Sequence, residues 1–225
     1  MSAPEQNSAP STGSGPSTGA GPSTGVDPST GVEPSSGIGA PAGMSCARVQ
    51  ADIIELAGLR ERTQVLKALA ARRALPLPPV GWVAAARDTL VLCVRPERWL
   101  LLSVPAAAGV ALSGWRAAGA ACAAAIELSS GLSALHLAGP AVLEVLARGC
   151  RLDLHPSAFV AGSAAATSMA QVQVIIAALP AGWLLLTPSS TAQHLREWLA
   201  AAAAPFGFAV GANVTVGSLS GERTP

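Results

Sequence analysis

Three pairs of short apolar segments, each pair joined by a few turn-forming residues, constrain the fold of this chain more than any other feature. The segments are rich in leucine, valine and isoleucine, and the joins contain proline, glycine or serine, which is the pattern of β-hairpins. The pairs are residues 89–94 with 98–104, 124–129 with 133–138, and 172–178 with 183–187. We therefore expect three hairpins, with helical segments between and after them.

Four helices are expected around the hairpins. In the first, apolar residues recur at helical spacing between residues 65 and 70, and Thr63 is placed to cap its start. The last helix is expected to start near Thr187 or Ser190, and Ser190 and Gln193 have the spacing of a capping box. The two remaining helices are expected at 106–120 and 140–148.

The resulting order is β-β-α three times over, with no repeated βαβ unit. This order predicts an α+β fold in which helices pack on an antiparallel or mixed sheet. Along the chain we expect an N-terminal helix and arm at 44–75, one domain at 76–208 and a flexible C-terminal tail at 209–225.

Residues 1–43 carry a repeat of six residues, with the sequence PSTG beginning at Pro10, Pro16, Pro22 and Pro28 and PSSG at Pro34. A repeat of proline, serine, threonine and glycine has no apolar face, so ordering it would cost chain entropy without burial in return. We expect a disordered tail, which is either a tether or phosphorylation segment or an expendable extension.

Charge and composition exclude several classes of function. The formal net charge is +1, and the longest basic run is the pair Arg72 and Arg73, so a nucleic-acid partner is not expected. The sequence has no GxGxxG and no GKS or GKT, the loops that cradle phosphates. The almost uncharged stretch 154–193 is broken by polar and turn residues, so no membrane partner is expected. Four widely spaced cysteines and no visible export signal indicate a cytoplasmic protein with reduced thiols.

The stretch 139–156, GPAVLEVLARGCRLDLHP, holds the candidate functional residues Arg148, Cys150, Asp153 and His155. Pro140 suits the first turn of a helix and Gly149 the position just after its end. Cys150 would then follow a helix C-terminus, whose dipole disfavours a thiolate, although Arg148 lies close enough in sequence to compensate. A packed structural thiol is therefore favoured over a nucleophile or a metal ligand.

Asp153 and His155 form a D-x-H sequence, which suits a base with its orienting carboxylate, two metal ligands, a contact with another chain, or a self-bonded loop. A zinc site needs three or four ligands, and His136 and His194 belong to unrelated elements. The favoured interpretation is that Asp153 caps backbone amides and His155 bonds a neighbouring carbonyl. We therefore assign no catalytic residue and no metal site, no cofactor-binding residue can be named, and all four candidates are expected to fix the loop or contact a partner.

The same stretch resembles the γ subunit of heterotetrameric sarcosine oxidase. The resemblance rests on Arg148-Gly149-Cys150, on Leu152-Asp153-Leu154-His155-Pro156 with Phe159, and on the strand Pro96-Glu97-Arg98-Trp99-Leu100-Leu101. It extends over about residues 75–208 and includes a closing helix with Trp198. Many positions that are charged in the family are alanine or serine in this chain.

The resemblance implies a fold similar to the folate-binding domain of aminomethyltransferases. It also implies a cytoplasmic oxidoreductase complex of sarcosine catabolism, which oxidises sarcosine or a related N-methyl amino acid to glycine with formation of hydrogen peroxide, linked to tetrahydrofolate. In the family, this chain would serve assembly without catalytic residues of its own. FAD, FMN, NAD, zinc and tetrahydrofolate would then belong to the partner α, β and δ subunits.

Two other functions remain open from the sequence. One is a stand-alone folate-binding protein of the aminomethyltransferase type, whose iron-sulfur-linked relatives carry K-G-C-x-x-G-Q-E. In this chain Gly149-Cys150 is followed by Arg151-Leu152-Asp153-Leu154, so the Gly-Gln-Glu part is missing. The other is a small adaptor without any link to amine oxidation.

Overall fold

Two sheets, packed face to face with helices on their outer sides, form the described part of the chain. The computed structural model describes residues 43–59, 61–105 and 108–219. The first sheet has the order β11-β1-β7-β10-β9-β8, with β12 also paired to β1, and the second has the order β3-β4-β5-β2-β6. All pairings are antiparallel except those of β11 and β12 with β1, which are parallel.

The elements have the following bounds. The first sheet consists of β1 (Met44–Gln50), β7 (Leu132–Ala138), β8 (Ala164–Met169), β9 (Val172–Leu179), β10 (Gly182–Pro188), β11 (Phe208–Val210) and β12 (Val214–Thr215). The second consists of β2 (Asp52–Gly58), β3 (Trp82–Ala86), β4 (Thr89–Arg95), β5 (Arg98–Ser103) and β6 (Ala123–Glu127). The helices are α1 (Thr63–Arg72), α2 (Ala108–Gly119), α3 (Val142–Ala147), α4 (Ala192–Ala203) and α5 (Val216–Leu219), with 3-10 turns η1 (Ser189–Thr191) and η2 (Ala204–Phe206).

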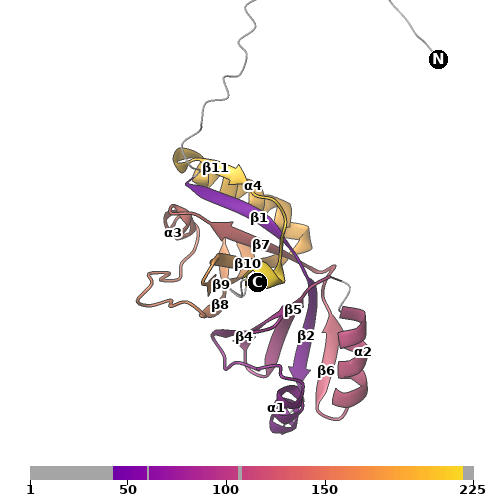
Figure 1. The fold of residues 1–225 in the computed structure, drawn as a ribbon. Helices are drawn as coiled ribbons and strands as arrows, with labels where there is room; N and C mark the ends of the chain where they lie inside the picture. The colour runs from indigo at the N-terminus through magenta and orange to yellow at the C-terminus, as the bar shows by residue number, and fades with distance from the viewer. Residues whose placement is uncertain (1–42, 60, 106–107, 220–225) are drawn as a thin grey trace, which may run out of the picture. The chain divides into compact units, whose positions relative to one another are not determined.

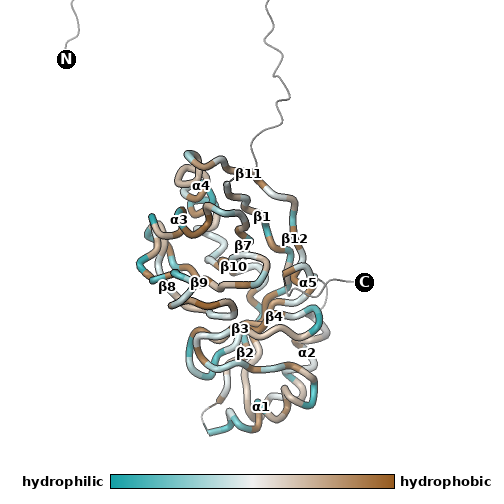
Figure 2. The backbone as a smooth tube through the Cα atoms, turned by 60° about the vertical axis from the view of Figure 1, so that its left-hand side comes forward, coloured by the Kyte–Doolittle hydropathy of each residue, from teal (hydrophilic) through white to brown (hydrophobic). Residues whose placement is uncertain are grey.

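Three hydrophobic clusters hold the layers together. The first joins one face of the first sheet to α3 and α4, through residues such as Leu185 and Leu195. The second fills the space between the two sheets, with Leu102 of β5 and Leu184 of β10. The third joins the second sheet to α1 and α2, which lie on its outer side (Figure 1). Figure 2 shows the corresponding alternation of hydrophobic strands with more hydrophilic turns.

Chain segments and backbone hydrogen bonds both connect the two sheets. β1 runs into β2 through Ala51, so one continuous segment contributes a strand to each sheet (Figure 1). The edge strands β3 and β8 also meet, because Val83 N donates to Gly162 O at 2.7 Å and Ala164 N donates to Gly81 O at 2.8 Å. The space between the sheets is therefore closed along part of its rim by backbone hydrogen bonds.

The structure confirms the α+β class, the antiparallel and mixed sheets, and the hairpins β4–β5 and β9–β10. The predicted hairpin of residues 124–129 with 133–138 is wrong. β6 pairs with β2 in the second sheet, whereas β7 pairs with β1 and β10 in the first. The short turn-like connection between β6 and β7 instead carries the chain from one sheet to the other.

The expected helix and arm at 44–75 is correct only for α1. Residues 44–58 instead form β1 and β2, and β2 lies in the interior of its sheet, between β5 and β6. Its residues Ile53, Ile54, Glu55 and Leu56 are all buried, because one face meets the other sheet and the opposite face meets the helices. Burial on both faces removes the alternation by which a half-buried strand is recognised.

Residues 209–219 differ from the flexible tail expected at 209–225. β11 and β12 pair with β1, and Val216 and Leu219 are buried in the cluster between the sheets. Residues 220–225 and the repeat-bearing tail, apart from Gly43, lie outside the described residues. Among the described residues, no helix is long and apolar enough to cross a membrane.

Neither predicted helix cap forms. Thr63 is the first residue of α1 rather than its cap, and its hydroxyl donates to Glu97 Oε1 at 2.6 Å. Thr191 stands at the N-cap of α4 without a side-chain cap, and Gln193 donates to Glu197 Oε1 at 2.7 Å. Packing of the apolar sides of α1 and α4 against the sheets therefore positions these helices without the capping bonds.

Candidate functional site

The candidate site is the short helix α3 and the loop that follows it. α3 begins at Val142, with Ala141 at its N-cap, so Pro140 precedes the helix instead of opening it. Val142, Val145 and Leu146 are buried against the first sheet. Because this apolar side is fully covered, the loop after α3 leaves the helix from a fixed position.

Arg148 ties the end of α3 to the end of α4. Its Nη1 donates to Ala202 O at 3.0 Å, and its Nη2 lies 3.5 Å from Glu144 Oε1. The guanidinium also lies over the ring of Phe206, 4.7 Å from the ring centroid. A guanidinium that uses its donors and its flat face together holds two elements in one relative orientation. Arg148 thus fixes the start of the loop.

Cys150 is a packed thiol. It is buried in the first cluster, and its backbone forms an isolated bridge with Met169, the last residue of β8. The described cysteines are all free and buried. Burial raises the pKa of the Cys46 thiol to about 11, against a smaller opposing effect of Arg196, and burial also raises the pKa of Cys93. These two thiols are therefore protonated and weakly reactive at neutral pH.

Asp153 and His155 are brought together, but not as a base and its orienting carboxylate. Asp153 Oδ1 accepts a hydrogen bond from the backbone N–H of His155 at 2.9 Å, as expected of a loop-fixing aspartate. His155 Nδ1 lies 2.7 Å from Ser157 Oγ and accepts from Ser157 N at 3.3 Å, so its partner is Ser157 rather than the expected carbonyl. The Asp153 carboxylate thus bonds to backbone and not to the imidazole, so the two residues do not form a base with its orienting carboxylate.

A surface groove of about 380 Å³ runs along α3 and this loop. Leu143 and Leu152 are only half-buried in its wall, and the exposed side chains of Glu144, Asp153 and His155 also line it. Among the described residues, no group of three or more histidine, cysteine, aspartate or glutamate side chains could hold a metal ion. The groove thus brings apolar and charged side chains together on one surface.

The packing around Gly149 explains why a glycine follows α3. Gly149 follows the C-cap residue Arg148, which is the position expected for it, but its φ is not positive. A Cβ at this position would lie 2.5 Å from Cη2 and Cζ2 of Trp198, whose ring packs from α4 directly against the glycine. Glycine is therefore required by close packing of α4 on the loop.

Replacing Gly149 with alanine is expected to lower the free energy of unfolding by about 1–3 kcal/mol, because the Trp198 ring must move away. Urea unfolding monitored by tryptophan fluorescence measures this loss. The double variant Gly149→Ala with Trp198→Phe removes the atoms that clash and should recover part of the lost stability. Equal losses in the single and double variants would contradict the packing explanation.

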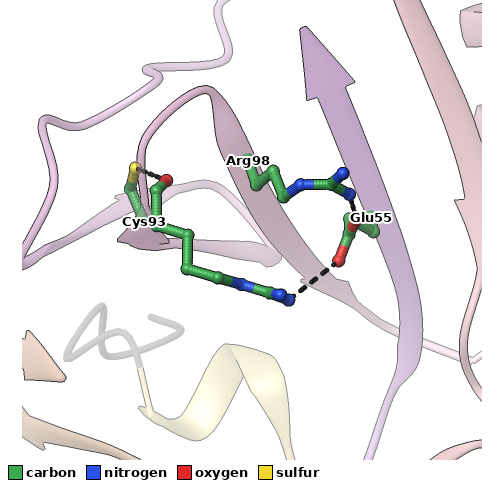
Figure 3. Close-up of polar contacts among 4 residues, drawn as sticks. Glu55, Cys93 and Arg98 are labelled. Atoms are coloured by element: carbon green, nitrogen blue, oxygen red, sulfur yellow. Dashed lines mark hydrogen bonds and ion pairs between the residues drawn. The ribbon is translucent and has the colours of Figure 1, made fainter. Parts of the chain in front are cut away.

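A cluster of charged side chains that the sequence did not predict lies on the second sheet. Arg98 Nη1 donates to Glu55 Oε1, and Arg95 Nη2 donates to Glu55 Oε2 at 3.5 Å (Figure 3). The side chain of Glu55 is 9% exposed, whereas those of Arg95 and Arg98 are 60% and 47% exposed. The only sequence signal was an isolated glutamate in an apolar run, which has meaning only once that run is known to be a strand.

Comparison with known proteins identifies the family. The model of the sarcosine oxidase, gamma subunit family matches residues 63–205, which includes the whole candidate site. The chain belongs to this family.

Curated relatives agree with this assignment. The sarcosine oxidase subunit gamma of Arthrobacter sp. is 37% identical over 135 residues, which are 59% of this chain and 66% of the relative. That of Corynebacterium sp. (strain P-1) is 34% identical over 129 residues, 56% of this chain and 63% of the relative. That of Corynebacterium sp. (strain U-96) is 35% identical over 143 residues, 62% of this chain and 69% of the relative. The matched region thus covers slightly less than two thirds of the first two relatives.

Solved structures confirm the fold expected from the family. A chain of the heterotetrameric sarcosine oxidase from Corynebacterium sp. U-96, in complex with pyrrole 2-carboxylate, matches with a TM-score of 0.65 and 28% identity, covering 81% of this chain and 88% of that chain. The glycine cleavage system aminomethyltransferase T from Bartonella henselae matches with a TM-score of 0.54 and 16% identity, covering 80% of this chain and 50% of that chain. The second likeness shows that the two proteins share a fold.

Proposed function

We propose that this chain is a noncatalytic gamma subunit of a heterotetrameric, flavin-dependent sarcosine oxidase and that its role is assembly. The observation that carries the proposal is the family match, which spans the whole candidate loop. The contacts of that loop support the noncatalytic part. Arg148, Asp153 and His155 are each engaged in bonds within the chain, and Cys150 is buried.

The proposed complex oxidises sarcosine, or a related N-methyl amino acid, to glycine with formation of hydrogen peroxide, linked to tetrahydrofolate. Its partners are the α, β and δ subunits, in the cytoplasm. FAD, FMN, NAD, zinc and tetrahydrofolate belong to those subunits in this proposal. The alternative of a stand-alone folate-binding protein has weaker support, because the likeness to aminomethyltransferase T extends to the fold, and fold does not determine function.

The groove along α3 and the loop is the proposed contact with a partner subunit. Leu143 and Leu152 offer apolar surface in this groove, and charged and polar side chains line it as well. Protein interfaces combine an apolar centre with a polar rim in this way. The loop-fixing bonds of Asp153 and Arg148 would hold this surface in its binding conformation before the partner arrives, which reduces the entropy lost on association.

Co-expression of this chain, carrying an affinity tag, with the remaining subunits of a sarcosine oxidase tests the proposal. We expect a yellow, flavin-containing complex that contains this chain and oxidises sarcosine, and an isolated chain that is colourless and inactive. Mass spectrometry of the purified complex identifies its subunits. An active oxidase that assembles while this chain stays unassociated would contradict the assignment, as would flavin or oxidase activity in the isolated chain.

A further inference from the structure

A cavity of about 540 Å³ opens between the two sheets, next to the Glu55 cluster. Its walls are mainly apolar and include Leu100 of the second sheet, Leu186 of the first, and Leu128 in the connection between them. Thr167 and Gln173, from β8 and β9, add polar groups on the wall formed by the first sheet. Small-molecule sites have this volume, about 300–1,000 Å³, and this combination of apolar walls with a few polar groups.

Strand alternation places Glu55 in this cavity. Ile53 of β2 belongs to the cluster between the sheets, and the residue two positions further along a strand points to the same side. Arg98 stands two residues before Leu100, which also faces the other sheet and pairs directly with Glu55. The glutamate and this arginine therefore meet on the side of the second sheet that faces the cavity.

An irregularity in β4 brings the second arginine to the same side. The pairing of β4 with β5 shifts register between Leu92 and Arg95, and beyond the shift Arg95 pairs with Arg98. Without the shift, Leu92 and Arg95 would point to opposite sides of the sheet, since they are three residues apart. Such bulges commonly redirect a side chain towards a site. Here the bulge directs Arg95 into the wall of the cavity.

The charges in the cluster leave an excess of one positive charge, because two guanidinium groups face one carboxylate. Both oxygens of Glu55 already accept hydrogen bonds from arginines, so the carboxylate has little capacity left for a cation. Among the described residues, the Arg95 side chain donates to Glu55 alone. Most of its five N–H groups therefore remain available, in the geometry that binds a carboxylate in a bidentate manner.

We propose that this cavity binds a small molecule that carries a carboxylate or a similar anionic group on an apolar body. The anionic group lies against Arg95, which Glu55 holds in place. The apolar body enters between the sheets, against Leu100, Leu128 and Leu186. The site lies in the second sheet and the space between the sheets, away from α3 and its loop, so it does not depend on the proposed role in assembly.

Phenylacetate and phenethylamine test this proposal, because they have the same ring on a short chain but opposite charges. Isothermal titration calorimetry of the whole 225-residue chain should give a Kd for phenylacetate on the order of 1 mM. Phenethylamine should bind at least about tenfold more weakly, because the local charge is positive. Equal or tighter binding of phenethylamine would overturn the proposal, and so would the absence of phenylacetate binding at about 10 mM, well above the expected Kd.

Variants locate the site. Arg95→Gln should weaken phenylacetate binding by about tenfold or more, through loss of a charge-assisted contact. Arg72→Gln, at an exposed position in the last turn of α1, is the matched control and should leave binding unchanged. The thermal unfolding midpoint of each variant shows that it is folded, which is expected because the Arg95 side chain is largely exposed. Unchanged binding in a folded Arg95→Gln protein would place the ligand elsewhere and overturn the proposal.

Discussion

Gly182→Ala is expected to lower the free energy of unfolding by about 3–5 kcal/mol, because it combines backbone strain with a clash in the first sheet. Gly182 begins β10 with a φ of +132°, a conformation that residues with a Cβ rarely adopt. A Cβ built there would lie 2.4 Å from the backbone oxygen of Leu137 and 2.9 Å from His136 Nε2. The Leu137 oxygen cannot retreat, since β7 is held between β1 and β10.

The same substitution in an open position provides the control. Gly109 lies in the first turn of α2, where a Cβ would meet nothing within 4 Å. Gly109→Ala is expected to leave stability unchanged or to raise it by up to about 1 kcal/mol, because alanine favours the helix. Urea unfolding of both variants, monitored by far-ultraviolet circular dichroism, compares them directly. A Gly182→Ala protein as stable as Gly109→Ala would show that β7 and β10 do not pack as closely as described.

Sequence reasoning succeeded where the structural signal is local. The hairpins β4–β5 and β9–β10 are marked by turn residues between two apolar segments, and both are present. The aspartate of the D-x-H sequence was expected to bond nearby backbone, and Asp153 does so two residues along the chain. Such contacts depend on residues that are neighbours in the sequence, so local chemistry is sufficient to predict them.

Sequence reasoning failed where the pairing or contact partner of a residue comes from a distant segment of the chain. The connection between β6 and β7 has the residues of a hairpin turn, yet β6 pairs with β2, because pairing depends on which strands the whole fold makes available. The contacts of Arg148 with Ala202 and Phe206 connect residues more than 50 positions apart in the sequence. The packing of Gly149 against Trp198 also joins two distant segments. The charge cluster at Glu55 was not predicted for the same reason, because it joins β2 to Arg95 at the end of β4, 40 residues later.

Leu152→Glu is expected to weaken binding of this chain to its partner subunits by about 100-fold or more, if the groove along α3 is the contact surface. Leu152 is half-buried at the groove, and a partner that covers it would have to bury an unpaired carboxylate in the variant. Pull-down of the co-expressed subunits, followed by titration of the purified components, measures the loss.

Leu59→Glu is the matched control, because Leu59 is also accessible, at 44% exposed, but follows β2 in the second sheet and does not line the groove. The Leu59→Glu chain should assemble normally.

Since Leu152 also packs against the first hydrophobic cluster, Leu152→Glu is expected to lower the stability of the isolated chain by about 1–2 kcal/mol, a loss that thermal unfolding measures separately from binding. His155→Ala keeps the apolar packing and removes a polar group from the groove together with its bonds to Ser157, so it should weaken assembly by a smaller factor and lower stability less than Leu152→Glu does. Normal assembly of a folded Leu152→Glu chain would place the subunit contact on another face, because burying an unpaired charge at an interface must weaken binding measurably.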